Sequence, residues 1–334
     1  MNHAKNKARG LGLCSGGLDS MLSALILRQQ HVEVEWISFE TPFFSAEKAR
    51  QAANMLRIPL TVRNITAPYM KMLVAPPCGY GQHMNPCMDC HTLMFRLAGE
   101  WMDENRFDFL FSGEVLGQRP MSQTRPSLRY VEKHSGRSGY ILRPLSAQLL
   151  DETVPEKNGW VDRARLLAIS GRSRKAQMTL AEQWGIRSYP TPAGGCLLTD
   201  KGFSVRLRDL FAHQSAYRES ELHLLRFGRH FRLSEKTRLI VGRTKEENEQ
   251  LLLYVEPSVD VVLKTRGIPG PTAVLPEFTE DASMLGLAAG ICAGYSKAST
   301  DSRVSVSLSG AGFSDTIQVL PRSAQEAKTW MIGG

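Results

Sequence analysis

The feature that most restricts what this chain can fold into is a glycine-rich turn near its N-terminus, SGGLDS at residues 15–20. Residues 10–14 before it form an apolar run typical of a strand, and residues 20–29 have the apolar spacing of a helix. Glycines let the backbone turn tightly and aim N–H groups outward, and a helix N-terminus adds partial positive charge, so the turn suits a phosphate. It matches neither GxxxxGK(S/T) nor GxGxxG, and a plain helix cap formed by Asp19 and Ser20 is the alternative.

Strand-like and helix-like runs continue to alternate after this turn. Strands are predicted at residues 32–39, 60–64 and 107–111, and helices at residues 46–56 and 92–104. Such alternation produces βαβ units, so the predicted fold class is α/β. We expect a doubly wound parallel sheet with ligands at the carboxyl ends of its strands.

Two long loops, residues 68–90 and 113–139, interrupt this alternation, and loops of that length are commonly functional. Helical spacing returns at residues 161–169 and 174–184. From about residue 201 the pattern changes to that of an α+β module. Its predicted strands cover residues 237–243, 259–265, 304–308 and 316–320, and its predicted helices lie near residues 246–254 and 283–295. The sequence therefore predicts two domains, residues 1–200 and 201–334.

Composition narrows the class of protein further. Hydrophobic residues make up 42% of the chain and charged residues 22%, which excludes a wholly disordered or coiled-coil chain. The 41 Lys plus Arg exceed the 33 Asp plus Glu, and the formal net charge of +8 favours a polyanionic partner. The first ten residues are basic and lack the apolar run of a secretion signal, and no apolar run is long enough to span a membrane. We expect a cytoplasmic protein without membrane contact.

The six cysteines are candidates for chemistry, because a cytoplasmic chain of this size more often carries thiols or metal ligands than disulfides. Cys87 and Cys90 form a CxxC pair ahead of a predicted helix, where a helix N-terminus stabilises thiolates. The pair alone is compatible with a redox pair, half of a zinc site or part of an iron–sulfur site. Cys196 is the third candidate, and Cys14 and Cys292 are predicted to pack in the core.

Four segments, in order along the chain, resemble one family. SGGLDS resembles the pyrophosphate loop of the PP-loop ATP-pyrophosphatase superfamily. FETPFFSAEKAR at residues 39–50, FSGEVLGQRPMSQT at residues 111–124 and ILRPLSAQLLDE at residues 141–152 resemble segments of tRNA 4-thiouridine synthetases. The resemblance covers residues 10–200. It implies a domain of adenine nucleotide alpha-hydrolase type that binds ATP and Mg²⁺ and adenylates a substrate oxygen.

The resemblance also implies roles for single residues. Asp19 would help to hold Mg²⁺ and pyrophosphate, Leu13, Ser38 and Phe39 would border the adenine, and Gly113 would line the nucleotide site. The full implied cofactor-binding set is Leu13, Ser15, Gly16, Gly17, Asp19, Ser20, Ser38, Phe39, Gly113 and Gln123. The sequence departs from the family at His91, near which the family has an arginine. We also expect neither the family's THUMP domain nor its rhodanese domain.

The cysteines resemble those of other sulfur-inserting PP-loop enzymes, which place a CxxC pair and one distant cysteine around the nucleotide site. This resemblance implies that Cys87, Cys90 and Cys196 hold a [4Fe–4S] cluster whose fourth iron stays open for a sulfide. One alternative is a Zn²⁺ site completed by Cys78 and His83. Another is a metal-free pair of thiols that carries a persulfide and resolves it.

The C-terminal half resembles a second family. Residues 239–251, 264–275 and 287–298 resemble the RNA-binding NFACT-R module. A basic run between Arg226 and Arg243, interleaved with Phe227 and Phe231, suits phosphate contacts and base stacking. A solvated basic face is the alternative. A second basic cluster comprises Arg163, Arg165, Arg172, Arg174 and Lys175.

Together these features predict an ATP-dependent tRNA sulfurtransferase with Asp19, Cys87, Cys90 and Cys196 as catalytic residues. Uridine is the predicted target, with 4-thiouridine favoured as the product and 2-thiouridine next. The predicted partners are tRNA and a sulfur donor, either a cysteine desulfurase or inorganic sulfide, and a homodimer stays open. The alternatives are a PP-loop ATP-pyrophosphatase acting on a small molecule and a non-catalytic RNA-binding protein that senses a nucleotide.

Overall fold

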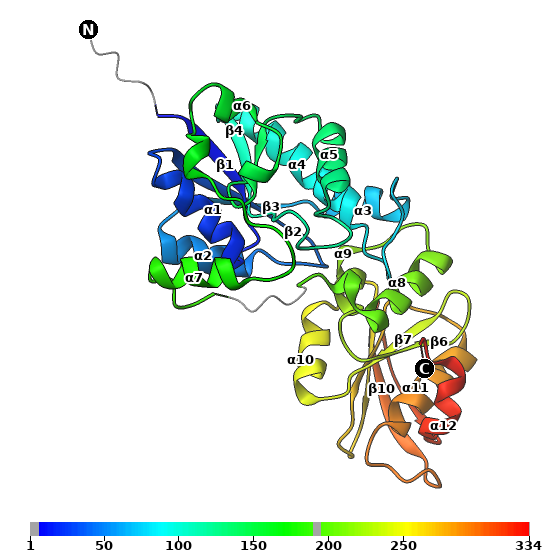
Figure 1. Cartoon of the computed structure of the whole chain (residues 1–334). Helices are drawn as coiled ribbons and strands as arrows, with labels where there is room; N and C mark the ends of the chain where they lie inside the picture. Colours follow the sequence, from blue (N-terminus) through cyan, green and yellow to red (C-terminus); the bar gives the residue numbers. More distant parts are fainter. Residues whose placement is uncertain (1–6, 190–194, 334) are drawn as a thin grey trace. The chain divides into compact units, whose positions relative to one another are not determined.

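The structure is a computed structural model that describes residues 7–189 and 195–333. It divides into two compact units, Met1–Leu197 and Leu198–Gly334, each with its own sheet and its own hydrophobic core (Figure 1). Over the described ranges, no helix is both long enough and apolar enough to cross a membrane.

The N-terminal unit is built on a five-stranded parallel sheet with the strand order β3-β2-β1-β4-β5. Its strands are β1 (Arg9–Leu13), β2 (Glu33–Glu40), β3 (Leu60–Asn64), β4 (Phe109–Ser112) and β5 (Ile141–Leu142). The chain first builds outward from β1 to β3 and then returns to add β4 on the other side of β1. The order therefore reverses between β1 and β4, and parallel sheets of this kind bind ligands at such a switch point.

Helices cover both faces of this sheet, as expected for a doubly wound domain (Figure 1). The helices of this unit are α1 (Leu18–Arg28), α2 (Glu47–Leu56), α3 (Thr66–Val74), α4 (Cys87–Glu104), α5 (Arg125–His134), α6 (Val154–Lys157) and α7 (Lys175–Gln183). Helices α1, α2 and α7 share a core with Trp36, Phe109 and Phe111 of the strands. Each large side chain buried there contributes roughly 1.5–3 kcal/mol to stability. The predicted α/β fold class is confirmed.

Three local predictions for this unit were wrong. Residues 161–169 are not a helix and contain only a short 3₁₀ turn, Arg163–Arg165, capped by Asp162. The long stretches predicted as loops contain α3 and α5, the second of which begins after the capping residue Thr124. Helix α4 begins at Cys87 rather than at residue 92, so the CxxC pair forms its first turn.

The C-terminal unit is an antiparallel sheet with helices, as the predicted α+β module requires. Its strand order is β11-β10-β8-β9-β7-β6. The strands are β6 (Arg229–Arg232), β7 (Arg238–Val241), β8 (Val261–Thr265), β9 (Thr272–Leu275), β10 (Val304–Gly310) and β11 (Phe313–Val319). The helices are α8 (Lys201–His213), α9 (Glu219–Leu224), α10 (Lys245–Leu253), α11 (Ala282–Gly294) and α12 (Ala324–Ala327). Helices α8 and α9 were not predicted from the sequence.

Candidate nucleotide and sulfur site

The glycine-rich turn lies at the switch point of the parallel sheet, where β1 ends and α1 begins. Gly16 has a φ of +72°, and a Cβ there would lie 2.2 Å from the backbone carbonyl carbon of Lys48. Gly17 is the N-cap of α1 with an ordinary φ of −81°. Gly113 follows β4, and a Cβ on it would lie 2.5 Å from the backbone of Asp19 and Ser20. Backbone packing from α2 and β4 therefore sets the shape of this turn.

Asp19 lies in the first turn of α1 and is surrounded by polar groups. Its Oδ2 accepts a hydrogen bond of 3.1 Å from Gln118 Nε2. Burial raises the pKa of Asp19, while the Gln118 hydrogen bond and the nearby charges of Arg174 and Arg119 act in the opposite direction. Gln177 of α7 also faces this carboxylate. Gln118 and Gln177 were missed because an isolated glutamine in a sequence carries no chemical signal.

Several buried polar atoms around Asp19 lack a partner within the part of the chain that the structure describes. They are Asp19 Oδ1, Gln118 Oε1, both amide atoms of Gln177 and Arg174 Nε. Buried polar groups are normally hydrogen-bonded, so an unsatisfied cluster calls for a ligand that would satisfy it. Carboxylate and amide oxygens suit Mg²⁺, and a guanidinium suits a phosphate. The residues present at Asp19 therefore fit a magnesium-bound pyrophosphate.

The predicted adenine-bordering residues lie at the same edge of the sheet. Leu13 ends β1 and is in register with Ile37 of β2 and Ser112 of β4. Ser38 and Phe39 follow Ile37 near the end of β2 and are buried.

Gln123 is also buried and lies in the loop before α5, where its backbone carbonyl accepts a hydrogen bond of 2.7 Å from Gly117 N. Its side-chain Oε1 has no partner in the described ranges. The predicted nucleotide residues thus come from strand ends, from the turn at residues 15–20 with the start of α1, and from this loop.

The CxxC pair and Cys196 gather around one buried aromatic residue, Tyr69 of α3. Burial and the nearby Cys90 and Cys196 raise the pKa of Tyr69 well above its ordinary value, and Cys87 adds to this effect. The Tyr69 ring packs against Phe43 and Phe44, with ring centroids 5.7 and 5.3 Å away.

The segment after Cys196 is attached to the same aromatic group by a hydrogen bond of 3.0 Å from Leu197 N to Phe43 O. Residues distant in sequence therefore meet at Tyr69, which sequence reasoning missed.

The cysteine environment differs from the sequence-based expectation in one respect. A helix N-terminus normally favours thiolates, but burial raises the pKa of Cys90, and the neighbouring Cys196 and Cys87 raise it further. This environment therefore favours the neutral thiol form of Cys90. Burial outweighs the field of the helix because the first turn of α4 is packed beneath Tyr69.

The three cysteines have donor atoms that suit a metal, but they are not closely grouped. The donor set consists of three soft sulfur atoms, which suits zinc or iron. In residues 7–189 and 195–333, however, no three His, Cys, Asp or Glu side chains lie close enough together to hold a metal ion. Cys78 is exposed, with its N–H donating to Asp89 Oδ2 at 2.9 Å and its thiol hydrogen-bonded to Tyr130. The cysteines converge but do not form a metal centre in this conformation.

His91, the residue after the CxxC pair, joins a buried charged network. His91 Nδ1 lies 2.8 Å from Glu114 Oε1, and Arg143 Nε donates to Glu114 Oε2 at 2.9 Å. Burial would raise the pKa of Glu114, yet Arg143 and His91 lower it to about 2. Arg143 also pairs with Glu132 of α5. The network fixes the first turn of α4, which carries both CxxC cysteines, to β4 and β5.

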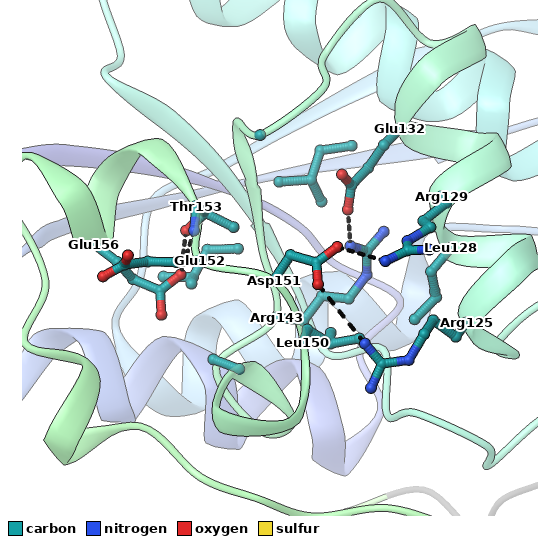
Figure 2. Close-up of a pocket in the computed structure, with 14 residues that line it drawn as sticks. Arg125, Leu128, Arg129, Glu132, Arg143, Leu150, Asp151, Glu152, Thr153 and Glu156 are labelled. Carbon is teal, nitrogen blue, oxygen red and sulfur yellow. Dashed lines mark hydrogen bonds and ion pairs between the residues drawn. The ribbon is translucent and has the colours of Figure 1, made fainter.

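A cavity of about 180 Å³ lies between α5, β5 and residues 147–156 (Figure 2). Arg143 forms part of its wall, and Asp151 pairs there with Arg129 at 2.8 Å and with Arg125 at 3.8 Å. None of the predicted nucleotide or cysteine residues lines this cavity. Because its cations already face carboxylates, the cavity does not select a ligand by charge.

The basic run of the C-terminal unit is not the free basic surface that its sequence suggested. Arg232 bonds Asp209 at 2.5 Å, Arg238 is buried against Glu221 at 3.2 Å, and Arg243 bonds Glu247 at 2.5 Å. His230 and Phe231 within the run are buried, and Phe227 stacks on Tyr254. Most of these side chains therefore hold the module together, because the run forms β6 and β7 rather than a loop.

The second basic cluster, in the N-terminal unit, is similarly divided. Arg163 pairs with Glu156 and donates to Leu150 O, whereas Arg174 acts on Asp19. Arg174 therefore belongs to the predicted phosphate site around Asp19 and not to a surface that could bind RNA.

Family comparisons match each unit to a different family. A family model described as "Thiamine biosynthesis protein (ThiI)" matches residues 6–154, and one described as "NFACT protein RNA binding domain" matches residues 228–331. The two matches agree with the two resemblances found in the sequence.

Curated relatives match parts of the chain. A tRNA-specific 2-thiouridylase MnmA of Syntrophomonas wolfei is 36% identical over 178 residues, covering 51% of this chain and 51% of the relative. The MnmA of Mycoplasma pneumoniae is 26% identical, covering 61% and 60% respectively. A probable tRNA sulfurtransferase of Finegoldia magna is 26% identical, covering 45% and 38%. The chain thus spans between 38% and 60% of the length of these relatives.

Among solved structures, a 4-thiouridine synthetase–RNA complex with bound ATP is similar at 19% identity and a TM-score of 0.34. The likeness covers 55% of this chain and 54% of that one.

Proposed function

We propose that this chain, whose N-terminal unit carries a PP-loop domain of the ThiI type and whose C-terminal unit carries an NFACT-R domain, is an ATP-dependent tRNA sulfurtransferase. The observation that carries the proposal is the unsatisfied polar cluster around Asp19 at the switch point, with a group of three cysteines in the same unit. One group suits ATP activation and the other suits sulfur handling. The tRNA thiolation named for the curated relatives supports this pairing.

In the proposed reaction, the turn at residues 15–20 holds the ATP phosphates through its backbone N–H groups and the N-terminus of α1. Asp19 holds Mg²⁺, which when bound would neutralise charge on the leaving pyrophosphate. Gln118 keeps the Asp19 carboxylate oriented through its hydrogen bond. A uridine carbonyl oxygen attacks the α-phosphorus of ATP, and pyrophosphate leaves.

Sulfur replaces oxygen in the second half of the reaction. A sulfur nucleophile handled by Cys87, Cys90 and Cys196 attacks the activated carbon, and AMP departs with the original oxygen. We propose 4-thiouridine as the product, because the ThiI match covers residues 6–154 of the N-terminal unit. The competing product is 2-thiouridine, which the MnmA relatives support. Sulfide or a cysteine desulfurase is the proposed donor.

The three cysteines are the proposed sulfur-handling group, and the [4Fe–4S] cluster is the proposed form of that group. Three thiolates with one open iron position would leave room for an exchangeable sulfur ligand. In the described residues the three cysteines are not grouped closely enough to hold a metal, so no step of the proposed reaction requires the cluster. Anaerobic reconstitution with iron and sulfide distinguishes the cluster from Zn²⁺ and from a metal-free persulfide pair.

The function is tested with purified protein, unmodified tRNA, ATP, Mg²⁺ and sulfide under anaerobic conditions. We expect thiouridine in the digested tRNA by mass spectrometry, with pyrophosphate released in equal amount. Asp19→Asn, which keeps the shape but removes the charge, should lower pyrophosphate release at least about a hundredfold. Absence of both 4-thiouridine and 2-thiouridine from the wild-type reaction, and unchanged thionucleosides in cells lacking the gene, would overturn the proposal.

Tyr69 is a proposed positioning residue for the sulfur. Its buried hydroxyl has no hydrogen-bond partner within the described residues and lies close enough to Cys90 to lower the pKa of that thiol. Tyr69→Phe keeps the ring packing but removes the hydroxyl that could donate to a sulfur as negative charge develops on it during transfer. We therefore expect thiolation to slow about 10- to 100-fold while pyrophosphate release is unchanged.

Tyr80→Phe is the matched control for this variant. It removes a hydroxyl that donates to Leu73 O at 2.7 Å, outside the cysteine group. Equal slowing of thiolation in the two variants, or a parallel loss of pyrophosphate release in Tyr69→Phe, would contradict the assigned role.

A further inference from the structure

One face of the C-terminal sheet is only partly covered. Helix α11 packs on the inner face, where Leu263, Val306 and Leu308 join its core. On the outer face, Leu251 of α10 covers Val274 of β9. Figure 1 shows α10 and α11 on opposite sides of this sheet. Helix α10 does not cover the outer face of β8, β10 and β11, and the side chains on that face are half-buried or exposed.

This outer face is lined almost entirely by hydroxyl and amide groups. Strand register places directly paired residues on the same face, so its members follow from the pairing. They are Val262, Lys264, Ser305, Ser307, Ser309, Ser314, Thr316 and Gln318. We call these eight residues the hydroxyl face. It contains no carboxylate and no aromatic ring.

Side chains on the hydroxyl face are held in place by hydrogen bonds along its surface. Gln318 Nε2 donates to Ser305 Oγ at 2.6 Å across β10 and β11. Ser307 Oγ donates to Lys264 O at 3.1 Å across β10 and β8. Each of these groups keeps further hydrogen-bonding capacity, because a hydroxyl both donates and accepts and an amide has several sites. The face is therefore a preformed array of donors and acceptors.

Cations gather at one end of the hydroxyl face, where β8 ends and β10 begins. Lys264 is on the face, Arg266 follows β8 with its N–H bonded to Ser305 O at 2.8 Å, and Arg303 immediately precedes β10. The backbone N–H of Lys297, the third residue after α11, donates to Pro269 O in the β8–β9 connection. All four are exposed, and none forms an ion pair within the described ranges, unlike Arg232, Arg238 and Arg243.

Two carboxylates lie near this group of cations. Asp301 is in the loop before β10, and Asp315 of β11 pairs with Leu308, which places it on the inner side of the strand. Neither is on the hydroxyl face. The local balance is therefore positive, and the uncompensated charge borders the array of hydroxyl and amide groups.

We propose that the hydroxyl face and its bordering cations, rather than the basic run of residues 226–243, form the surface on which this unit holds the sugar–phosphate backbone of tRNA. The inference rests on the proposed function and adds the location and the kind of contact. Lys, Arg, Ser, Thr and Gln are the side chains that most often contact phosphate and sugar oxygens. The 2′-hydroxyl of RNA adds a donor and an acceptor that such an array can match.

Because the hydroxyl face has no aromatic rings, it is better suited to double-stranded than to single-stranded RNA. Single-stranded RNA is held mainly by stacking of its bases on aromatic side chains, which this face does not offer. An RNA helix instead presents phosphates and 2′-hydroxyls across its wide, shallow minor groove. The face is therefore suited to a base-paired stem of tRNA and recognises its shape rather than its base sequence.

The test uses the full chain and unmodified tRNA, with dissociation constants measured by filter binding across a range of salt concentrations. The triple variant Lys264→Gln, Arg266→Gln, Arg303→Gln should bind tRNA about 10- to 100-fold more weakly. Its plot of log affinity against log salt should be shallower by up to roughly 2.7 units, about 0.9 for each of the three phosphates that are no longer neutralised. A second variant, Ser307→Asp with Thr316→Asp, puts two carboxylates at paired positions of the face and should weaken binding at least tenfold.

The matched control is the triple variant Lys201→Gln, Lys236→Gln, Lys328→Gln, which removes the same charge from exposed positions outside the face. It should change affinity less than threefold, and all variants are compared by thermal melting. If both triple variants weaken binding equally while the wild type binds tRNA, the hydroxyl face is wrong and the proposed function stands. If the wild type does not bind tRNA, the proposed function fails. Tighter binding of a single strand than of an RNA duplex would overturn the preference for a stem.

Discussion

Cys196→Ser should abolish tRNA thiolation, by at least about a thousandfold, while pyrophosphate release continues. Cys196 lies beside Cys90 and Tyr69 but is absent from the polar cluster around Asp19, so its loss should affect sulfur transfer and leave ATP activation in place. Cys87→Ser and Cys90→Ser should behave in the same way. The measurement is the ratio of thiouridine formed to pyrophosphate released under anaerobic conditions.

Two control variants make this result interpretable. Cys292→Ala replaces a buried cysteine of α11 and should leave the ratio unchanged, because Cys292 packs in the core of the other unit. Cys78→Ser should also leave it unchanged, and a full loss there would instead support the Zn²⁺ alternative completed by Cys78. Thiolation that persists in all three Cys87, Cys90 and Cys196 variants would contradict the sulfur-handling role.

Anaerobic reconstitution with iron and sulfide distinguishes the proposed forms of the cysteine group. A [4Fe–4S] cluster should give a brown chromophore near one cluster per chain that is lost in Cys196→Ser. A colourless protein that carries a persulfide on one cysteine would support the metal-free alternative and overturn the cluster.

Gly16→Ala should destabilise the N-terminal unit by roughly 2–5 kcal/mol and eliminate ATP use. Alanine at a φ of +72° costs about 1–2 kcal/mol, and overpacking adds about 1–3 kcal/mol. The added Cβ would lie 2.2 Å from the backbone of Lys48, so α2 or the turn must move. Urea unfolding measures the stability, and pyrophosphate release measures the activity.

Gly17→Ala is the control for this effect. Gly17 has a negative φ, and its added Cβ would meet only Ser15 Oγ, at the ordinary contact distance of 3.5 Å. We expect its unfolding free energy to stay within about 1 kcal/mol of the wild type, as for a tolerated glycine-to-alanine change. Equal stability of the two variants would show that the turn is not held by α2 in the way described.

The sequence predicted the parts of the N-terminal unit in which local pattern and tertiary packing agree. Strands such as Leu60–Asn64 and the turn at residues 15–20 have strong apolar spacing and glycine signals, and they lie where predicted. The prediction failed at residues 161–169, which have helical spacing but contact the residues that follow α1 instead. There Arg165 donates to Gln29 O, and Asp162 N–H donates to Gln30 Oε1.

Contacts between distant residues could not be predicted. The ion pair between Arg232 and Asp209 joins β6 to α8. The sequence of a basic run does not indicate which carboxylates its side chains will pair with. The meeting of Tyr69 with Cys196 likewise depends on the hydrogen bond between Leu197 and Phe43, far apart in the chain. Sequence supplied candidates for the chemistry, whereas the fold determined which of them share a site.

The close approach of Gly113 to the backbone of Asp19 and Ser20 has a thermodynamic consequence for ligand binding. A loop that must order itself around a ligand loses conformational entropy, which lowers its affinity. Here β4 and α2 already hold the first turn of α1 and the turn before it in one arrangement. A phosphate that enters would therefore meet N–H groups that are already oriented, and little of the binding free energy would be spent on ordering the chain.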